Sequence, residues 1–197
     1  MAHEHGHGGI VEGANKRIAI LISVLALMLA IAETLGKSAQ TEALSFNVEA
    51  SNLWAFYQAK TIRKTTMETA AEQMEVDIQL AKDAAVKDLL TNRAKDWRDR
   101  AARYESEPKP NNKGEGRREL MARALEAEVK RDHAMAKYHD FEFGSAAFQI
   151  AIVLASSYLI TGVAYLLWGA VGLGAIGLLF SLIGLAAPHA LAFLGAH

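Results

Sequence analysis

The chain has 197 residues, enough for one or two domains, and its 21 Lys and Arg residues nearly balance its 22 Asp and Glu residues. This balance excludes bulk electrostatic attraction to nucleic acid or to anionic lipid. The absence of Cys excludes disulfides, thiolate metal sites and cysteine nucleophiles. Because there are only three Pro residues and few β-branched runs outside the apolar segments, we expect an almost entirely helical protein.

Residues 1–16 form a His-rich and Gly-rich tail that is too polar to bury a core, and we predict that it is disordered. His3, His5 and His7 alternate with short residues, a spacing that lets several imidazoles reach one Cu, Ni or Zn ion. The alternative is a solvated tail that binds such metals only adventitiously, because flexible His-rich tracts bind metals without selectivity.

Residues 17–36 are apolar, carry no charge between Arg17 and Glu33, and follow Lys16. The segment resembles the core of a signal peptide, but no small-x-small cleavage site follows it, so we interpret it as an uncleaved first transmembrane helix. Small residues recur along it at spacings of four and three, which predicts a stripe for close helix packing at Ala19, Ser23, Ala26 and Ala30.

Residues 37–143 are charged and rich in Ala, which predicts an extramembrane helical body. Helices are expected at 38–107 and 117–143, and the Pro-rich and Gly-rich loop 106–116 is expected at the tip of a hairpin. An apolar stripe begins at Met67 and changes register between Ala85 and Val86, which we interpret as a change in supercoil phase. At 1.5 Å per residue the two helices would be about 105 and about 40 Å long, so we expect the first one to bend, break or lie partly along the membrane, with residues 60–66 as the best candidate, or to tilt steeply around neighbouring subunits.

Aromatic, amide and basic side chains gather at the start of this body. Trp and Tyr prefer the boundary between lipid and water, and adjacent Lys or Arg side chains can reach phosphates, so an interfacial collar is expected at Asn52, Trp54, Tyr57, Gln58, Lys60, Arg63 and Lys64. The alternative is ordinary helix packing, because Phe46, Ala50, Leu53 and Tyr57 also recur at spacings of four and three.

Residues 144–168 and 169–197 each contain an apolar segment long enough to span a membrane, and we expect an antiparallel pair of helices that turns at Gly169. The third spanning helix carries a stripe of small residues, which predicts tight packing within a subunit or between subunits, at Ala170, Gly174, Gly177, Ser181 and Gly184. The second is the most polar of the three. Its Gln149, Ser157 and Thr161 either line a path for ions or solutes or hydrogen-bond to neighbouring helices.

Motifs that carry catalysis are not evident in the sequence. It has no Gly-rich phosphate loop that opens a helix, no His-Glu-x-x-His and no nucleophile with a base, so we expect no enzymatic activity and no cofactor beyond adventitious Cu, Ni or Zn. His133 and His139 are six residues apart and do not share a helical face, so a solvated surface is the better interpretation. The positive-inside rule gives a divided answer, and we favour a cytoplasmic body.

The segment Ser51-Asn-Leu-Trp-Ala-Phe-Tyr-Gln-Ala-Lys-Thr-Ile-Arg63 resembles the signature of the uncharacterised bacterial membrane family catalogued as domain of unknown function 4337. The resemblance extends over nearly the whole chain apart from the tail. It implies one spanning helix, a helical body and a spanning pair, located in a bacterial inner membrane. It implies no catalytic residue.

The sequence therefore predicts an all-α membrane protein, with three transmembrane helices and a coiled-coil-like helical hairpin inserted between the first and the second. The leading hypothesis is a homo-oligomeric scaffold or interaction module, whose partners are membrane lipids, further copies of itself and other membrane or peripheral proteins, but not nucleic acid. The alternatives are an oligomeric channel for ions or small solutes, lined by the polar second helix, and a metal-responsive membrane protein that uses the His tract.

Overall fold

The computed structural model describes residues 8–110, 114–188 and 190, with the backbone alone for residues 8–15. This part of the chain contains four helices and no strand, which confirms the all-helical prediction. The helices are α1 (Gly8–Leu80), α2 (Ala84–Glu105), α3 (Arg117–Thr161) and α4 (Ala164–Ala186). They form two compact units, a terminal unit of residues 1–44 and 132–197 and a central unit of residues 45–131.

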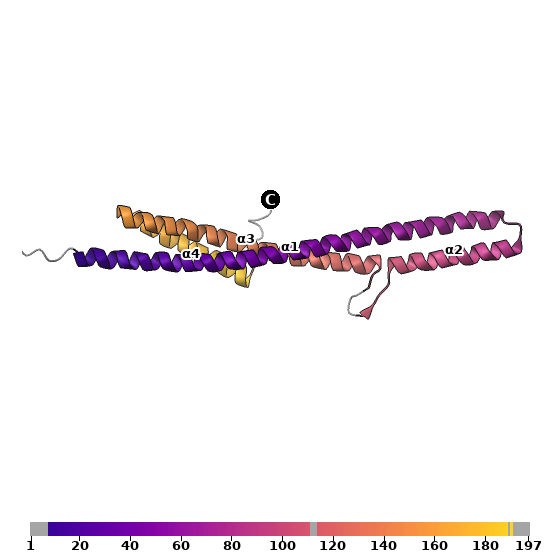
Figure 1. The fold of residues 1–197 in the computed structure, drawn as a ribbon, viewed down its shortest axis with the longest axis horizontal. Coiled ribbons are helices and arrows are strands. Elements are labelled where there is room, and N and C mark those ends of the chain that lie inside the picture. Colours follow the sequence, from indigo (N-terminus) through magenta and orange to yellow (C-terminus); the bar gives the residue numbers. More distant parts are fainter. Residues whose placement is uncertain (1–7, 111–113, 189, 191–197) are drawn as a thin grey trace, which may run out of the picture. The chain divides into compact units, whose positions relative to one another are not determined.

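Helix α1 runs without a break from Gly8 to Leu80 (Figure 1). The predicted helix 38–107 does break, but between Leu80 and Ala84, so the predicted position at residues 60–66 is wrong. Thr61 and Thr66 are accommodated within the helix, where their hydroxyls donate to the carbonyls of Tyr57 and Ile62, four residues earlier, at 2.8 and 2.9 Å. The first Pro of the chain is Pro108, so no residue of α1 lacks the backbone N–H that a helix needs.

The chain reverses at residues 81–83, between α1 and α2. Asp83 caps α2, because its backbone is extended and its carboxylate accepts a 2.7 Å hydrogen bond from the N–H of Ala85. The change in stripe register between Ala85 and Val86 therefore accompanies a change of helix, and its interpretation as a supercoil phase shift was wrong.

In the central unit, residues 45–80 of α1 pack against a returning arm that consists of α2 and the start of α3. At 1.5 Å per residue the outgoing arm is about 54 Å long, and α2 together with residues 117–131 is about 56 Å long, so the two arms match. An ion pair between Glu75 and Arg98 and another between Lys64 and Glu105 fix the antiparallel register. The loop 106–116 joins α2 to α3 partway along this arm, which corrects its predicted place at the tip.

The core of the central unit lies between α1 and α3, where the buried residues are Ala50, Leu53, Leu120, Ala124 and Ala127. Trp54 and Tyr57 pack at its edge. The apolar stripes predicted along 67–85 and 86–104 also face inward, since Ala71, Ala94 and Ala101 are 3% exposed or less. Alanine at these positions lets the helices approach closely.

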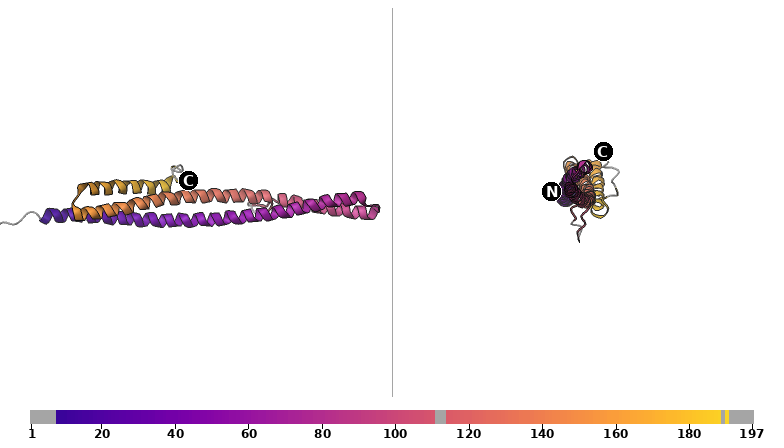
Figure 2. Two further views of the ribbon diagram at one scale, coloured as in Figure 1. Left: turned by 90° about the horizontal axis from the view of Figure 1, so that it is seen from above. Right: turned by 90° about the vertical axis from the view of Figure 1, so that its right-hand side faces the viewer.

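The terminal unit is built from the first part of α1, the second part of α3 and α4. These three helices are long and apolar enough to cross a membrane. Leu25 and Ala32 of α1 form a buried cluster with Phe141, Phe148 and Ala151 of α3. Helix α4 lies alongside α3 (Figure 2).

The turn between α3 and α4 falls at residues 162 and 163, so the predicted division at Gly169 is wrong. Gly162 has φ of 70°, in the left-handed region where a residue without Cβ is favoured. Gly169 instead lies inside α4, where an added Cβ would stand 3.2 Å from Cδ1 of Leu154. Its lack of a side chain serves packing and not the turn.

Candidate functional site

The small-residue stripe predicted on α4 lies at its contact with the rest of the terminal unit. Ala170 is fully buried, and Cβ atoms added at Gly174 and Gly184 would come within 2.9 Å of Leu25 Cδ2 and Asp140 Cβ. Ser181 is partly buried, and its hydroxyl donates to the Gly177 carbonyl within α4. This stripe therefore packs within the subunit.

Gly144 of α3, which the sequence analysis missed, is the counterpart of Gly177. A Cβ added at Gly177 would be 2.9 Å from the Gly144 carbonyl oxygen and 2.9 Å from two ring atoms of Phe148. A Cβ added at Gly144 would be 2.8 Å from Ser181 Oγ. The two helices thus cross backbone to backbone, and the signal that could have found Gly144 is a lone Gly inside a long helical pattern.

The small-residue stripe predicted on α1 faces away from the other helices of the terminal unit. Its members, Ala19, Ser23, Ala26 and Ala30, are all exposed. Helix α1 packs instead through Ile18, Leu25 and Ala32, which are 7% exposed or less. The structure therefore does not bring the two predicted stripes together.

The polar residues predicted to line a path are hydrogen-bonded inside the unit. The hydroxyls of Ser157 and Thr161 donate to carbonyls four residues earlier in α3, at 2.9 Å each. The side-chain amide of Gln149 donates to Glu33 of α1 at 3.2 Å. Only the Gln149 bond fits the prediction of hydrogen bonds to a neighbouring helix, whereas the Ser157 and Thr161 bonds stay within α3, and the path stays a prediction.

The residues of the predicted collar meet α2 and α3 in the central unit. The Trp54 indole donates to Glu128 at 2.9 Å, and the Lys60 ammonium lies 5.2 Å from the centre of the Tyr104 ring. Asn52, Gln58 and Arg63 are exposed. The packing alternative thus accounts for Trp54, whereas contact with lipid stays a prediction.

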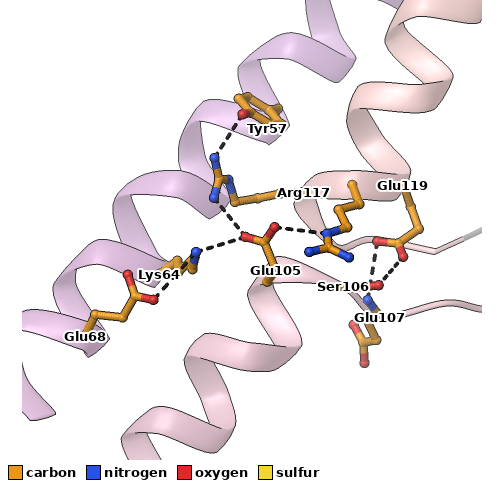
Figure 3. Close-up of polar contacts among 9 residues, drawn as sticks. Tyr57, Lys64, Glu68, Glu105, Ser106, Glu107, Arg117 and Glu119 are labelled. Atoms are coloured by element: carbon orange, nitrogen blue, oxygen red, sulfur yellow. Dashed lines mark hydrogen bonds and ion pairs between the residues drawn. The ribbon is translucent and has the colours of Figure 1, made fainter.

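Glu105, the last residue of α2, ties the end of this helix to α1 and α3 (Figure 3). Its carboxylate lies 3.0 Å from Lys64 Nζ, 2.9 Å from Arg117 Nη1 and 3.2 Å from Arg118 Nε. Arg117 also donates to the Tyr57 hydroxyl at 2.9 Å. One carboxylate thus joins three helices, and we call this group of five residues the Glu105 clasp.

The charges of the Glu105 clasp stabilise one another. The hydrogen bond from Lys64, together with that from Arg118, holds the pKa of Glu105 below its ordinary value despite partial burial. The same bond to Glu105 raises the pKa of Lys64. Because these side chains pair with one another at a helix junction, with only Arg117 Nε of their buried atoms left without a hydrogen bond, the arrangement serves to fix the structure.

The loop after α2 is held by Glu119, which lies in the first turn of α3. Its carboxylate accepts hydrogen bonds from the Ser106 hydroxyl at 2.6 Å and from the Glu107 backbone N–H at 3.3 Å (Figure 3). These bonds anchor both residues to the start of α3. The junction of α2 and α3 is therefore a fixed structural element.

Residues 45–80 of α1 carry a stripe on the face opposite to the core of the central unit, which we call the outward stripe. Its positions alternate at spacings of three and four, are all exposed and hold no charged residue; they are Ser45, Val48, Asn52, Ala55, Ala59, Ile62, Thr66, Thr69, Gln73, Val76 and Leu80. Val48, Ile62, Val76 and Leu80 are each at least half exposed. Sequence reasoning missed this stripe because stronger apolar stripes lie on the inward faces.

The predicted metal ligands His3, His5 and His7 lie outside the described residues. Within the described part of the chain, no three His, Asp or Glu side chains are grouped so that they could hold a metal ion. His139 contacts Glu142 three residues later on α3, with 3.4 Å between Nδ1 and Oε2. The structure thus leaves metal binding by the tail as a prediction.

Residues 14–187 match the family described as Domain of unknown function (DUF4337). Neither a curated protein nor a solved structure matches the chain. The match begins at residue 14, after His3, His5 and His7, and includes all of α2, α3 and α4, so it agrees with the resemblance of the segment 51–63. The chain belongs to the DUF4337 family.

Proposed function

We propose that this protein is a non-enzymatic, homo-oligomeric scaffold or interaction module of the bacterial inner membrane. Three helices are long and apolar enough to cross a membrane, and the central unit is inserted between the first and second of these apolar segments. Such an insertion starts and finishes at one membrane surface, and its charged residues favour water. The central unit then projects from the membrane as a helical module.

The observation that carries this proposal is the outward stripe. The outward face of a helix in a soluble unit ordinarily carries its charged residues. Here residues 45–80 contain Glu49, Lys60, Arg63, Lys64, Glu68, Glu72, Glu75 and Asp77, yet none of these eight lies on the outward stripe. The stripe is about 54 Å long, and its positions lie alternately three and four residues apart and hold no charged residue. Such a face is typical of a helix that packs against another helix.

A second copy of the chain is the occupant that fits this stripe. Chains in one membrane share an orientation, so two α1 helices would meet in parallel and each residue would face its own equivalent. An uncharged stripe meets itself without repulsion, and Asn52 supplies the kind of polar position that fixes register. A strip about 54 Å by about 10 Å on each chain gives about 1,100 Å² in total, just above the roughly 1,000 Å² that a specific interface needs.

The charge pattern favours a cytoplasmic central unit. Lys130, Arg131 and Lys137 precede the second apolar segment, whereas the turn at residues 162 and 163 carries no charge. Basic residues near the ends of spanning helices tend to stay on the cytoplasmic side.

The proposal is tested by placing a charge on the outward stripe. In Ile62→Lys, parallel association brings two ammonium groups together, so the dissociation constant measured by light scattering of full-length protein in detergent should rise at least tenfold. Val129→Lys on α3 is the matched control, because Val129 is 69% exposed and Ile62 is 68% exposed. A monomeric wild-type protein, or dissociation by the Val129 variant alone, contradicts the proposal.

Disulfide trapping tests the orientation and register independently. The chain has no Cys, so single-cysteine variants are unambiguous. Asn52→Cys on the outward stripe should form a disulfide dimer under mild oxidation in the membrane, because a disulfide requires Cα atoms within about 7 Å of each other. Asn47→Cys is also exposed but lies off the stripe, and it should stay monomeric. Equal trapping of both variants contradicts a defined parallel interface.

A further inference from the structure

The central unit has an open groove between α1 and the first turns of α3. It has a volume of about 400 Å³ and is lined by Leu53, Phe56, Ala59, Lys60, Arg63, Glu115, Leu120 and Arg123. This volume falls within the roughly 300–1,000 Å³ of small-molecule sites. None of these residues belongs to the Glu105 clasp.

The floor of the groove is apolar. Leu53 and Leu120 are 5% and 4% exposed and belong to the core between α1 and α3. Ala59 contributes only a methyl group, and Phe56 is 61% exposed beside it. A flat or extended apolar group would be sheltered here on several sides, and its burial would be favourable by roughly 25 cal/mol for each Å².

The rim of the groove is cationic. Lys60, Arg63 and Arg123 face a single carboxylate, Glu115, whose own nearest ion-pair partner is Lys109 at 3.9 Å. Among the described residues, Arg63 and Arg123 have no ion pair or hydrogen bond from their side chains. In contrast, both Arg residues of the Glu105 clasp form an ion pair with one carboxylate.

We propose that this groove binds an amphiphilic anion, that is, a phosphate or carboxylate joined to an apolar body. The apolar body would cover Leu53, Phe56 and Leu120, and the anion would be held by Arg63 and Arg123, whose planar guanidinium groups suit bidentate contact with phosphate and carboxylate. The chain has a net charge of −1, so the attraction comes from this local surplus of cations and not from the protein as a whole. Both walls of the groove belong to one chain, and of its lining residues only Ala59 also lies on the outward stripe.

The test uses 1-naphthyl phosphate as the probe, titrated calorimetrically into full-length protein in nanodiscs of phosphatidylcholine. We expect saturable binding with one probe for each chain, binding at least tenfold weaker for inorganic phosphate, and none for naphthyl-trimethylammonium. The double variant Arg63→Gln/Arg123→Gln should lose at least tenfold in affinity. Arg93→Gln, at an exposed position of α2 outside the groove, is the control and should bind as the wild-type protein does.

A third variant separates loss of the site from loss of the fold. Phe56→Ala should weaken the naphthyl probe more than inorganic phosphate, while circular dichroism keeps its helical signal. Replacing 30% of the phosphatidylcholine with phosphatidylglycerol distinguishes two sources of the anion: competition identifies a membrane lipid, and unchanged binding identifies a soluble molecule. No saturable binding to the wild-type protein, or equal binding to the double Arg variant, overturns the proposal.

Discussion

Gly177→Ala tests how closely α3 and α4 approach each other, because it adds one methyl group at the point where they cross. The new methyl would stand 2.9 Å from the Gly144 carbonyl oxygen and 2.9 Å from Cδ1 and Cε1 of Phe148. Phe148 is 2% exposed and packs in the core of the terminal unit, so its ring has little room to move. The carbonyl oxygen is backbone and yields only if the two helices separate.

The expected magnitude is the difference of two opposing effects. Overpacking of a close-packed contact costs about 1–3 kcal/mol. Replacement of Gly by Ala inside a helix is favourable by about 1 kcal/mol. The difference is about 0–2 kcal/mol, so Gly177→Ala should destabilise the protein by up to about 2 kcal/mol.

The same helix offers a matched control and an intermediate case. A Cβ added at Gly172 meets no atom within 4 Å, so Gly172→Ala should be neutral or stabilising by up to about 1 kcal/mol. At Gly174 the nearest atom is Leu25 Cδ2 at 2.9 Å, the flexible end of a side chain, so Gly174→Ala should fall between the other two.

The assay is reversible unfolding of full-length protein in mixed micelles by SDS titration, followed by circular dichroism. The three variants should rank with Gly172→Ala the most stable and Gly177→Ala the least. If Gly177→Ala were as stable as Gly172→Ala, the backbone approach of α3 to α4 would be refuted. A loss at Gly172 as large as at Gly177 would show that α4 packs through a different face.

Two further predictions concern the Glu105 clasp and the turn after α3. Because Lys64 lowers the pKa of Glu105, the stabilisation that Glu105 provides is present above the ordinary carboxyl pKa of 4.5 and is lost as the pH falls below it. Glu105→Gln should cost about 1–2 kcal/mol at pH 7 and should flatten this acid dependence in chemical unfolding. An unchanged dependence of stability on acid pH would contradict the role of the clasp. Gly162→Ala should cost about 1–2 kcal/mol through the φ of 70° at this residue alone, because no atom lies within 4 Å of the added Cβ. Gly162→Asn should recover part of this loss, since Asn adopts positive φ more readily than Ala does. Equal stability of the two variants would refute this reasoning.

Periodicity in the sequence predicted the inward faces of the helices well. Ala50 and Leu53 of the stripe that begins at Phe46 are buried, as is Ala71 of the stripe that begins at Met67. These positions could be found because burial against a neighbouring helix selects apolar or small residues every three or four positions. Apolar or small residues are required on an inner face whichever helix covers it. Their spacing in the sequence therefore shows which face of a helix is buried but not which helix packs against it.

The loop 106–116 was predicted closely from its Pro and Gly residues, since α2 ends at Glu105 and α3 begins at Arg117. The other two breaks between helices were predicted poorly, because each depends on a few local atoms. The reversal at residues 81–83 rests on the Asp83 cap, and Asp is common on exposed helix faces as well. The turn at residue 162 rests on one Gly among several in an apolar region, and chain composition drew the boundary to Gly169 instead. The unequal lengths of the predicted helices 38–107 and 117–143 indicate that the longer one is not a single straight arm. They do not locate the break, because any break that makes the two arms of the hairpin equally long is consistent with these lengths.

A predicted small-residue stripe is buried only where another helix of the same chain lies against it. The α4 stripe is buried against α3 and α1, whereas the equally regular α1 stripe at residues 19–30 is exposed, and sequence spacing alone does not separate these cases. Exposure adds the missing information. In residues 45–80, the exposed positions of the outward stripe hold residues such as Ser, Ala, Thr and Val, and none of the eight charged residues of this segment lies among them. Water does not select against charge, and the proposed protein partner would explain why this face carries none.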